Sequence, residues 1–199
     1  MFDEGYIKFS ITQIDGDLPD NSNLEQLNLT RTVIHKMGLL GVYPNGIGFG
    51  NVSVRDKGDS FIISGSATGS DEVLSLDKYA FVKEFNLKKN SVISVGKTKA
   101  SSESMSHGAV YRANKNINSV IHIHSKKMFD CMLKNGYVAT PSSAQFGTPQ
   151  LAIEIFNMVK DGKRENGIIV MAGHNEGIIF YGNNIKTVEQ NILSEFGKF

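Results

Sequence analysis

The amino-acid sequence predicts an α/β protein in which helices cover both faces of a mixed or mostly antiparallel sheet. Segments with the two-residue periodicity of strands alternate along the chain with segments that have the periodicity of helices. Turn-forming residues at 56–59 and 174–177 separate neighbouring strand-like runs, so the sheet is not wholly parallel. No repeat or flexible linker divides the 199 residues, which indicates a single domain over residues 1–199.

The first half of the chain begins with a strand and a helix. Residues 6–14 alternate, so Ile7, Phe9 and Ile11 share one face of a half-buried strand. Asn23 is a favourable cap for a helix that ends near Gly38. The further elements expected in this half are strands at 48–55, 60–65 and 91–96 and a helix at 76–85.

The second half alternates more plainly between helices and strands. Thr148 and Pro149 begin one helix, because proline fits the first helical turn. The elements expected here are helices at 102–113, 126–135, 148–161 and 187–199 and strands at 119–124, 167–173 and 177–181.

Composition and charge exclude several classes of protein. Lys+Arg 21 against Asp+Glu 20 gives a net charge of +1, which argues against charge-driven binding to nucleic acid or to a membrane. Cys131 is the single cysteine, so no disulfide can form within the chain. No apolar run approaches the ~20 residues of a membrane span, and the acidic start is unlike a secretory signal. We therefore expect a cytoplasmic protein.

The sharpest local motif is His122-Ile123-His124 on the predicted strand 119–124. Alternate side chains of a strand share a face, so both imidazoles project together. Two such imidazoles are half of a site for Zn²⁺ or a similar divalent ion. The alternative is a pair of polar residues on an exposed strand face.

Two other residues could complete such a site. His174 follows the apolar strand 167–173, where α/β folds place ligands, although an ordinary turn also explains it. Glu103 opens the helix at 102–113 with a serine as its cap, and it shares a helix face with His107. The helix dipole alone also explains a carboxylate there, and His107 either supports Glu103 or simply packs.

Two glycine-rich runs suggest an anion cradle. One contains Asn51 and the other contains Ser66. Together with Ser101 and Ser102 at a helix N-terminus, they could bind an oxyanion or a phosphate, or they could be ordinary turns. The sequence has no serine-nucleophile elbow, Walker A loop or dinucleotide fingerprint.

Six segments in this order resemble the class II aldolase/adducin family, and within it most closely the L-fuculose-1-phosphate aldolases. Ribulose-phosphate 4-epimerases and a sugar-phosphate dehydratase are the other related branches. The combination of segments is specific where each fragment alone is not. The segments are GFGNVSVR (48–55), FIISGSATG (61–69), SSESMSHGAVY (101–111), SVIHIHS (119–125), FGTPQLA (146–152) and IIVMAGHNEGIIFYG (168–182).

The resemblance implies a three-layer α/β/α sandwich with a mostly antiparallel central sheet, assembled as a homotetramer with active sites between subunits. It implies one divalent metal ion per chain, expected to be Zn²⁺, and a catalytic acid/base that also ligates the metal at rest. By resemblance, the metal ligands are His122, His124 and His174, the acid/base is Glu103, and the residues near the substrate phosphate are Asn51, Ser66, Ser101 and Ser102.

The implied activity is that of a lyase, which cleaves a small phosphorylated sugar by retro-aldol chemistry through a metal-stabilised enediolate. The alternatives are a sugar-phosphate epimerase or dehydratase on the same fold, and a non-catalytic adducin-like binding or assembly domain. Because such binding domains are expected to lose metal-binding histidines, the three histidines retained here favour the enzyme.

The sequence departs from the aldolase branch in several places. In the aldolase branch a tyrosine just before the Phe-Gly-Thr stretch donates a proton, but residues 140–145 here contain no tyrosine. We also expect the C-terminal tyrosine tail of that branch to be missing. His174 lies in GHNEG rather than in a compact His-Gly, and the run around Ser66 is longer than its family counterpart. Tyr137 is a candidate substitute for the missing acid.

Overall fold

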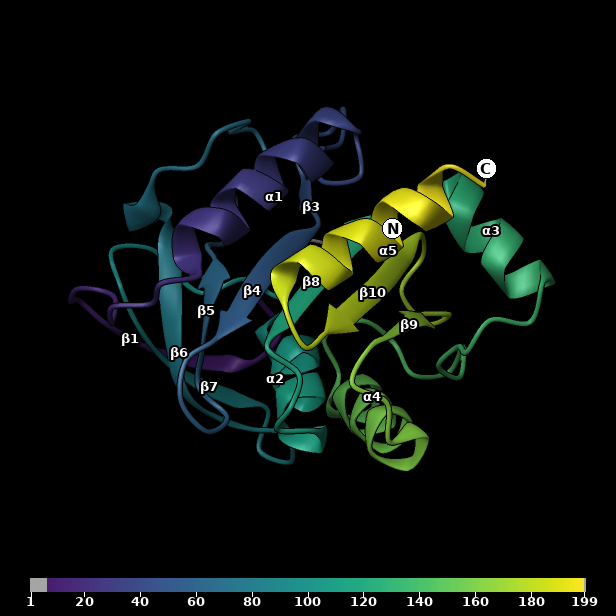
Figure 1. Ribbon diagram of the computed structural model, residues 1–199. Coiled ribbons are helices and arrows are strands. Elements are labelled where there is room, and N and C mark those ends of the chain that lie inside the picture. Colours follow the sequence, from purple (N-terminus) through teal and green to yellow (C-terminus); the bar gives the residue numbers. More distant parts are fainter. Residues whose placement is uncertain (1–6, 199) are drawn as a thin grey trace.

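The computed structural model describes residues 7–198, in which one large sheet lies between two layers of helices (Figure 1). The sheet has eight strands in the order β1-β7-β6-β5-β4-β8-β10-β9. Strands β1 and β7 are parallel, and every other neighbouring pair is antiparallel. The strands are β1 (Ser10–Ile14), β4 (Asn51–Arg55), β5 (Phe61–Ser64), β6 (Tyr79–Asn86), β7 (Ser91–Val95), β8 (Ser119–His124), β9 (Gly167–Val170) and β10 (Gly177–Gly182). This confirms the three-layer α/β/α sandwich with a mostly antiparallel sheet.

Two further short strands, β2 (Gly41–Val42) and β3 (Gly48–Phe49), form a separate antiparallel hairpin. The sequence patterns do not predict β2. Strand β3 belongs to the segment that was expected to be one strand over 48–55, but the chain breaks at Gly50. Gly50 has φ +74°, and a Cβ atom there would lie 2.6 Å from Cβ of Leu40. Only glycine combines this left-handed conformation with so close an approach.

Helices α1 (Leu24–Lys36), α3 (Lys126–Lys134) and α5 (Ile185–Phe196) pack on one face of the sheet. Helices α2 (Ser104–Ala113) and α4 (Pro149–Gly162) pack on the other, which is the lower face in Figure 1. Each face has its own apolar core. Strand β8 contributes Ile121 and Ile123 to the first core and Val120 to the second.

The alternation along β8 decides where its histidines point. Since Ile121 and Ile123 face α1 and α5, the side chains of His122 and His124 lie on the face of α2 and α4. Asn51 lies directly opposite His122 on the neighbouring strand β4, so its side chain is on this face too. The strand pattern thus brings two imidazoles and an amide to one side of the sheet.

The prediction of a helix at 76–85 is wrong. Leu76–Lys78 form one 3₁₀ turn, and Tyr79–Asn86 form strand β6 between β5 and β7. Aromatic and β-branched residues such as Tyr79 and Val82 favour strands. A register shift between Val82 and Glu84 interrupts the alternation that would have revealed the strand.

Other predicted elements differ at their ends. The expected strands at 6–14 and 167–173 shorten to β1 and β9, and the last helix, expected at 187–199, begins at Ile185. Residues 6 and 199 lie outside the described range. Asn23 precedes α1 as expected, but its side chain makes no capping hydrogen bond. Both predicted turns do connect antiparallel strands, β4 with β5 and β9 with β10.

Helices in the described part of the chain are too short or too polar to cross a membrane.

Candidate metal centre

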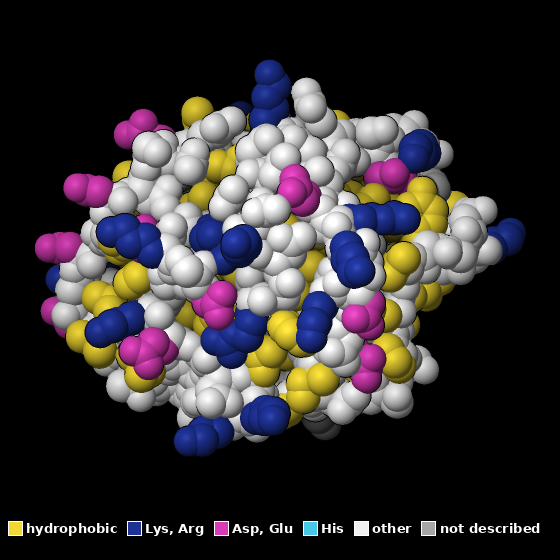
Figure 2. All heavy atoms as spheres, turned by 60° about the horizontal axis from the view of Figure 1, so that its bottom comes forward, with side chains coloured by type: hydrophobic (Ala, Val, Ile, Leu, Met, Phe, Trp, Pro, Cys, Tyr) yellow, Lys and Arg dark blue, Asp and Glu magenta, His cyan; other side chains and the backbone are white. Residues whose placement is uncertain are grey.

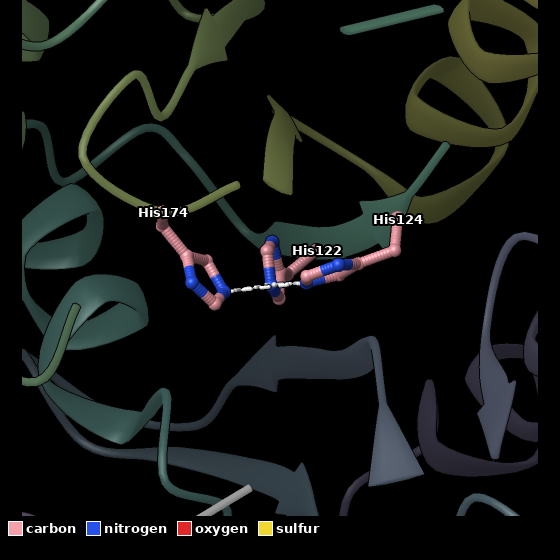
Figure 3. Close-up of side chains that lie close together, drawn as sticks. All are labelled: His122, His124 and His174. Carbon is pink, nitrogen blue, oxygen red and sulfur yellow. Dashed lines mark hydrogen bonds between the residues drawn. The ribbon is translucent and has the colours of Figure 1, made fainter. Parts of the chain in front are cut away.

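Three histidine side chains converge at the end of β8. His122 and His124 come from the strand itself, and His174 comes from the turn between β9 and β10 (Figure 3). The Nε2 atom of His122 lies 3.0 Å from that of His124 and 3.2 Å from that of His174, and the third side of this triangle is also 3.2 Å. Among residues 7–198, no other group of three potential metal ligands lies as close together.

The imidazoles are buried and uncharged. Their exposed fractions are 1% for His122, 3% for His124 and 5% for His174. Burial lowers the pKa of His124 to about 3 and lowers the pKa values of His122 and His174 well below their usual range, with the neighbouring imidazoles as a further cause for both. On the side that carries α2 and α4, Figure 2 shows basic and acidic side chains interspersed, and no histidine is in view.

Aromatic rings hold two of these imidazoles in place. Phe146 stacks on His174 with ring centroids 4.5 Å apart and an interplanar angle of 18°. Phe49 of β3 lies against His124 at 5.7 Å and against Tyr43 at 4.4 Å. The short hairpin missed by the sequence patterns therefore forms one wall of the histidine cluster.

A glycine provides room for the same cluster. A Cβ atom on Gly177 would lie 2.5 Å from Cδ2 of His174 and 3.0 Å from Cε1 of His122. Any other residue at this position would push the two rings away from their present places.

Glu103 lies at the N-terminus of α2, beside the histidines. Its Oε1 is 3.7 Å from Nε2 of His174, and its side chain is 4% exposed. The expectation that a serine caps this helix is wrong, because Glu103 itself occupies the cap position. Ser101 instead accepts the Glu103 N–H at its Oγ, at 3.3 Å, and fixes the turn before the helix.

His107 lies one turn further along α2 and points into the sheet. Its Nδ1 is 2.7 Å from Oγ of Ser53, which is also 2.7 Å from the hydroxyl of Tyr111. Burial, and then the neighbouring His122, lower the pKa of His107 well below its usual range. His107 thus belongs to a buried polar network with Ser53 and Tyr111.

A cavity of about 230 Å³ opens in front of the cluster. Glu103 and His122 line it together with all four residues expected near a phosphate, namely Asn51, Ser66, Ser101 and Ser102. Asn51 is 6% exposed, and its Oδ1 has no hydrogen-bond partner among the described residues. A buried amide oxygen left without a partner at a cavity wall is suited to a ligand.

The structure places the candidate acid Tyr137 away from this cavity, and with it two lysines that precede Ser101 in the sequence. Tyr137 donates its hydroxyl to Oε2 of Glu195 at 2.9 Å. Lys97 pairs with Asp15, and Lys99 is exposed. Neither these residues nor Cys131 lines the cavity.

Comparison with protein families identifies the chain. The model of the class II aldolase and adducin N-terminal domain matches residues 45–194. The chain belongs to the class II aldolase/adducin family. No curated protein matches it.

Several solved structures of similar fold are described as aldolases. An L-fuculose 1-phosphate aldolase is 18% identical with a TM-score of 0.64, and the match covers 91% of this chain and 84% of that one. L-fuculose-1-phosphate aldolase from Thermus thermophilus is 20% identical with a TM-score of 0.56, covering 89% and 87%. YgbL from Escherichia coli, described provisionally as an aldolase, epimerase or decarboxylase, is 15% identical with a TM-score of 0.63, covering 87% and 84%.

The histidine triangle of this class II aldolase/adducin domain fits a divalent metal ion. In a tetrahedral site with metal–nitrogen distances of about 2.0–2.1 Å, the ligand nitrogens lie about 3.3–3.4 Å from one another. The three Nε2–Nε2 distances observed here are close to this value. Nδ1 of His122 lies 3.3 Å from the carbonyl oxygen of Ile178, so this nitrogen carries the proton and Nε2 keeps its lone pair. A buried cluster of neutral imidazoles could therefore bind a metal.

Proposed function

We propose that the protein is a divalent-metal-dependent lyase that cleaves a small phosphorylated sugar by retro-aldol chemistry. The observation that carries this proposal is the buried triangle of three imidazole nitrogens beside Glu103, with His122 and Glu103 lining a cavity. Membership of the class II aldolase/adducin family and the fold shared with fuculose-phosphate aldolases support it.

His122, His124 and His174 would hold the metal. A bound divalent ion supplies Lewis-acid stabilisation of the negative charge that develops when a carbon–carbon bond beside a carbonyl breaks. The three histidines and Glu103 are themselves buried, and electrostatic interactions are stronger in such a setting than in water.

Glu103 would move the proton. Its carboxylate lies beside the histidine cluster and lines the cavity, so a substrate bound there would contact it. The carboxylate would take the proton of the hydroxyl on the carbon that becomes the aldehyde. It would return a proton to the carbon beside the carbonyl once the bond between the two carbons has broken.

The phosphate would bind to the other polar groups that line the cavity. Asn51, Ser66, Ser101 and Ser102 offer an amide and three hydroxyl groups, and α2 directs its N-terminus there. A helix N-terminus and neutral hydrogen-bond donors can bind an anion, so no lysine or arginine is needed for this. Lysine and arginine are absent from the described lining of the cavity.

Metal analysis is the first test. We expect about one divalent ion per chain, with Zn²⁺ as the proposed metal, in the purified protein or after incubation with Zn²⁺ or Mn²⁺. A His122→Ala/His124→Ala variant should contain none. If the wild-type protein binds no metal under any of these conditions, the lyase is excluded and a binding or assembly domain remains.

Substrate cleavage is the second test. Phosphorylated ketoses would be incubated with the metal-loaded protein, and the products would be followed by NMR. Two shorter carbonyl compounds indicate cleavage, whereas a change of stereochemistry or loss of water indicates epimerisation or dehydration. Epimerisation or dehydration is the second candidate function, and one observation favours it. Glu103 and His122 are the only titratable groups that line the described cavity, so a second proton donor is lacking there.

We also propose, from the family resemblance, that the protein is a homotetramer with its sites between subunits. From the composition of the sequence we propose that it works in the cytoplasm. Light scattering would measure the oligomeric state, and activity should fall on dilution to monomer. Activity that survives in an isolated monomer would contradict a site shared between subunits.

A further inference from the structure

The turn that carries His174 also carries a carboxylate that reaches the other side of the histidine cluster. Glu176 follows His174 by two residues, in the segment that makes this chain differ from the compact His-Gly of the aldolases. Its Oε2 accepts a hydrogen bond from the hydroxyl of Tyr43 at 2.9 Å. The same hydroxyl oxygen lies 3.0 Å from Nδ1 of His124.

The chemistry of the three groups decides which of them donates in each of the two hydrogen bonds. A carboxylate only accepts hydrogen bonds, and a phenol has a single hydrogen. Because Tyr43 donates that hydrogen to Glu176, its oxygen can only accept from His124. Nδ1 of His124 therefore carries the proton, and the lone pair lies on Nε2, the atom that faces His122 and His174.

Both supporting residues are held in place by the backbone around them. Tyr43 begins the turn of the β2–β3 hairpin, where its N–H donates to the carbonyl of Ile47 and its ring packs on Phe49. Glu176 has φ +66°, and its carbonyl accepts the N–H of Ser125, the residue after His124. Tyr43 does not line the cavity, so it acts through His124 rather than on a substrate.

We infer that Tyr43 and Glu176 are positioning residues of the metal centre, which fix the ligating tautomer and the ring orientation of His124. This inference rests on the proposed metal-binding function. Partners behind a ligating histidine typically contribute a factor of about 10–100 in metal affinity. The negative Glu176 also makes the imidazole a stronger donor to a cation, through the intervening hydroxyl.

The test compares Tyr43→Phe, Glu176→Gln and the double variant with the wild-type protein. A matched control exists in the chain, because Tyr137 donates to Glu195 over the same 2.9 Å, remote from the cavity. Tyr137→Phe therefore removes the same kind of hydrogen bond, and Glu195→Gln removes the same kind of charge. Zn²⁺ dissociation constants would be measured by competition with a chromophoric chelator.

We expect affinity to fall about 10–100-fold in Tyr43→Phe and Glu176→Gln, and to stay at the wild-type value in the controls. The double variant should bind Zn²⁺ about as tightly as the weaker-binding of the two single variants. The two effects should not add, because both residues act through the same series of hydrogen bonds. Affinities of Tyr43→Phe and Glu176→Gln within about twofold of wild type would overturn the inference and leave the proposed function intact.

A second measurement is independent of metal and of activity. In ¹⁵N NMR spectra of the metal-free protein, His124 should be the Nδ1–H tautomer in the wild type and a mixture of tautomers in Tyr43→Phe. An unchanged tautomer in Tyr43→Phe would overturn the inference. A wild-type protein that binds no metal would overturn the proposed function, and the inference with it.

Discussion

The Oε1 atom of Glu103 lies 3.7 Å from the Nε2 atom of His174, although the two residues belong to a helix terminus and to a turn on the far side of β8. Both side chains are almost fully buried. The contact joins the group proposed to move a proton to the group proposed to hold the metal. Substitutions that remove one group at a time should therefore separate proton transfer from metal binding.

Replacing His122 by alanine should abolish stoichiometric metal binding without unfolding the protein. His122 is one of three converging ligands, whereas the two apolar cores on either side of the sheet do not include it. Elemental analysis would report the metal. Unfolding of metal-free wild type and variant by urea should give stabilities within about 2 kcal/mol of each other. Global unfolding of the variant would show that the histidine is a structural residue.

Replacing Glu103 by glutamine should leave the metal in place and lower turnover by about 10²–10⁴-fold. The amide keeps the size of the side chain but cannot take a proton. Metal content and the rate of cleavage would be measured on the same preparation. Turnover equal to that of wild type would remove Glu103 from its proposed role, whereas loss of the metal would assign it to the ligand set.

Replacing Gly177 by alanine should weaken metal binding about 10-fold or more, since the added methyl group would lie 2.5 Å from the ring of His174. Gly162→Ala is the matched control, because an added Cβ there has no atom within 4 Å. The dissociation constant for Zn²⁺ would be compared across the three proteins. Equal affinity for Gly177→Ala would mean that the rings move aside without cost.

The stability of the metal-free protein should fall on acidification. The pKa of each of the four buried histidines, the three of the cluster and His107, lies below the unfolded value of about 6.5, chiefly through burial. Below about pH 6.5 the unfolded chain binds more protons than the folded chain. The contribution of these histidines to the free energy of unfolding is therefore fully present above this pH and is lost as the pH falls. For His124 the loss continues to about pH 3.

His107→Gln isolates one contribution to this pH dependence. Each buried histidine adds a slope of up to about 1.4 kcal/mol per pH unit, so the variant should show a shallower slope than wild type between about pH 6 and pH 4. Urea unfolding at several pH values, in the presence of a chelator, would measure it. Identical slopes would mean that His107 titrates normally in the folded protein.

The local patterns predicted those parts of the site that depend on one element at a time. The two-residue period of strand 119–124 placed His122 and His124 on one face, and the structure brings them together. That His174 joins them depends on the pairing of β10 with β8, which no local pattern reveals. Its place after an apolar strand made it a candidate, and only the family resemblance made it a metal ligand. The helix expected at 76–85 was wrong because the bulge in β6 disguises a buried strand.

Tyr43 and Glu176 could not have been identified from the sequence. Tyr43 is 81 positions from His124 and 133 from Glu176, and neither residue type is unusual in a turn. The only local signal was the inserted Asn-Glu after His174, and it had no obvious partner. A short hairpin of two-residue strands, too brief for any periodicity, supplies that partner.

The place of β8 between β4 and β10 also determines when the histidine cluster can form. The ribosome delivers Asn51, His122 and His124 before His174 and before β10, the strand that pairs with β8 on its other side. A nascent chain therefore exposes two of the three histidines while its sheet still lacks β9 and β10. Loading with metal is expected to follow completion of the sheet, so that the ion locks a finished fold rather than guiding its formation.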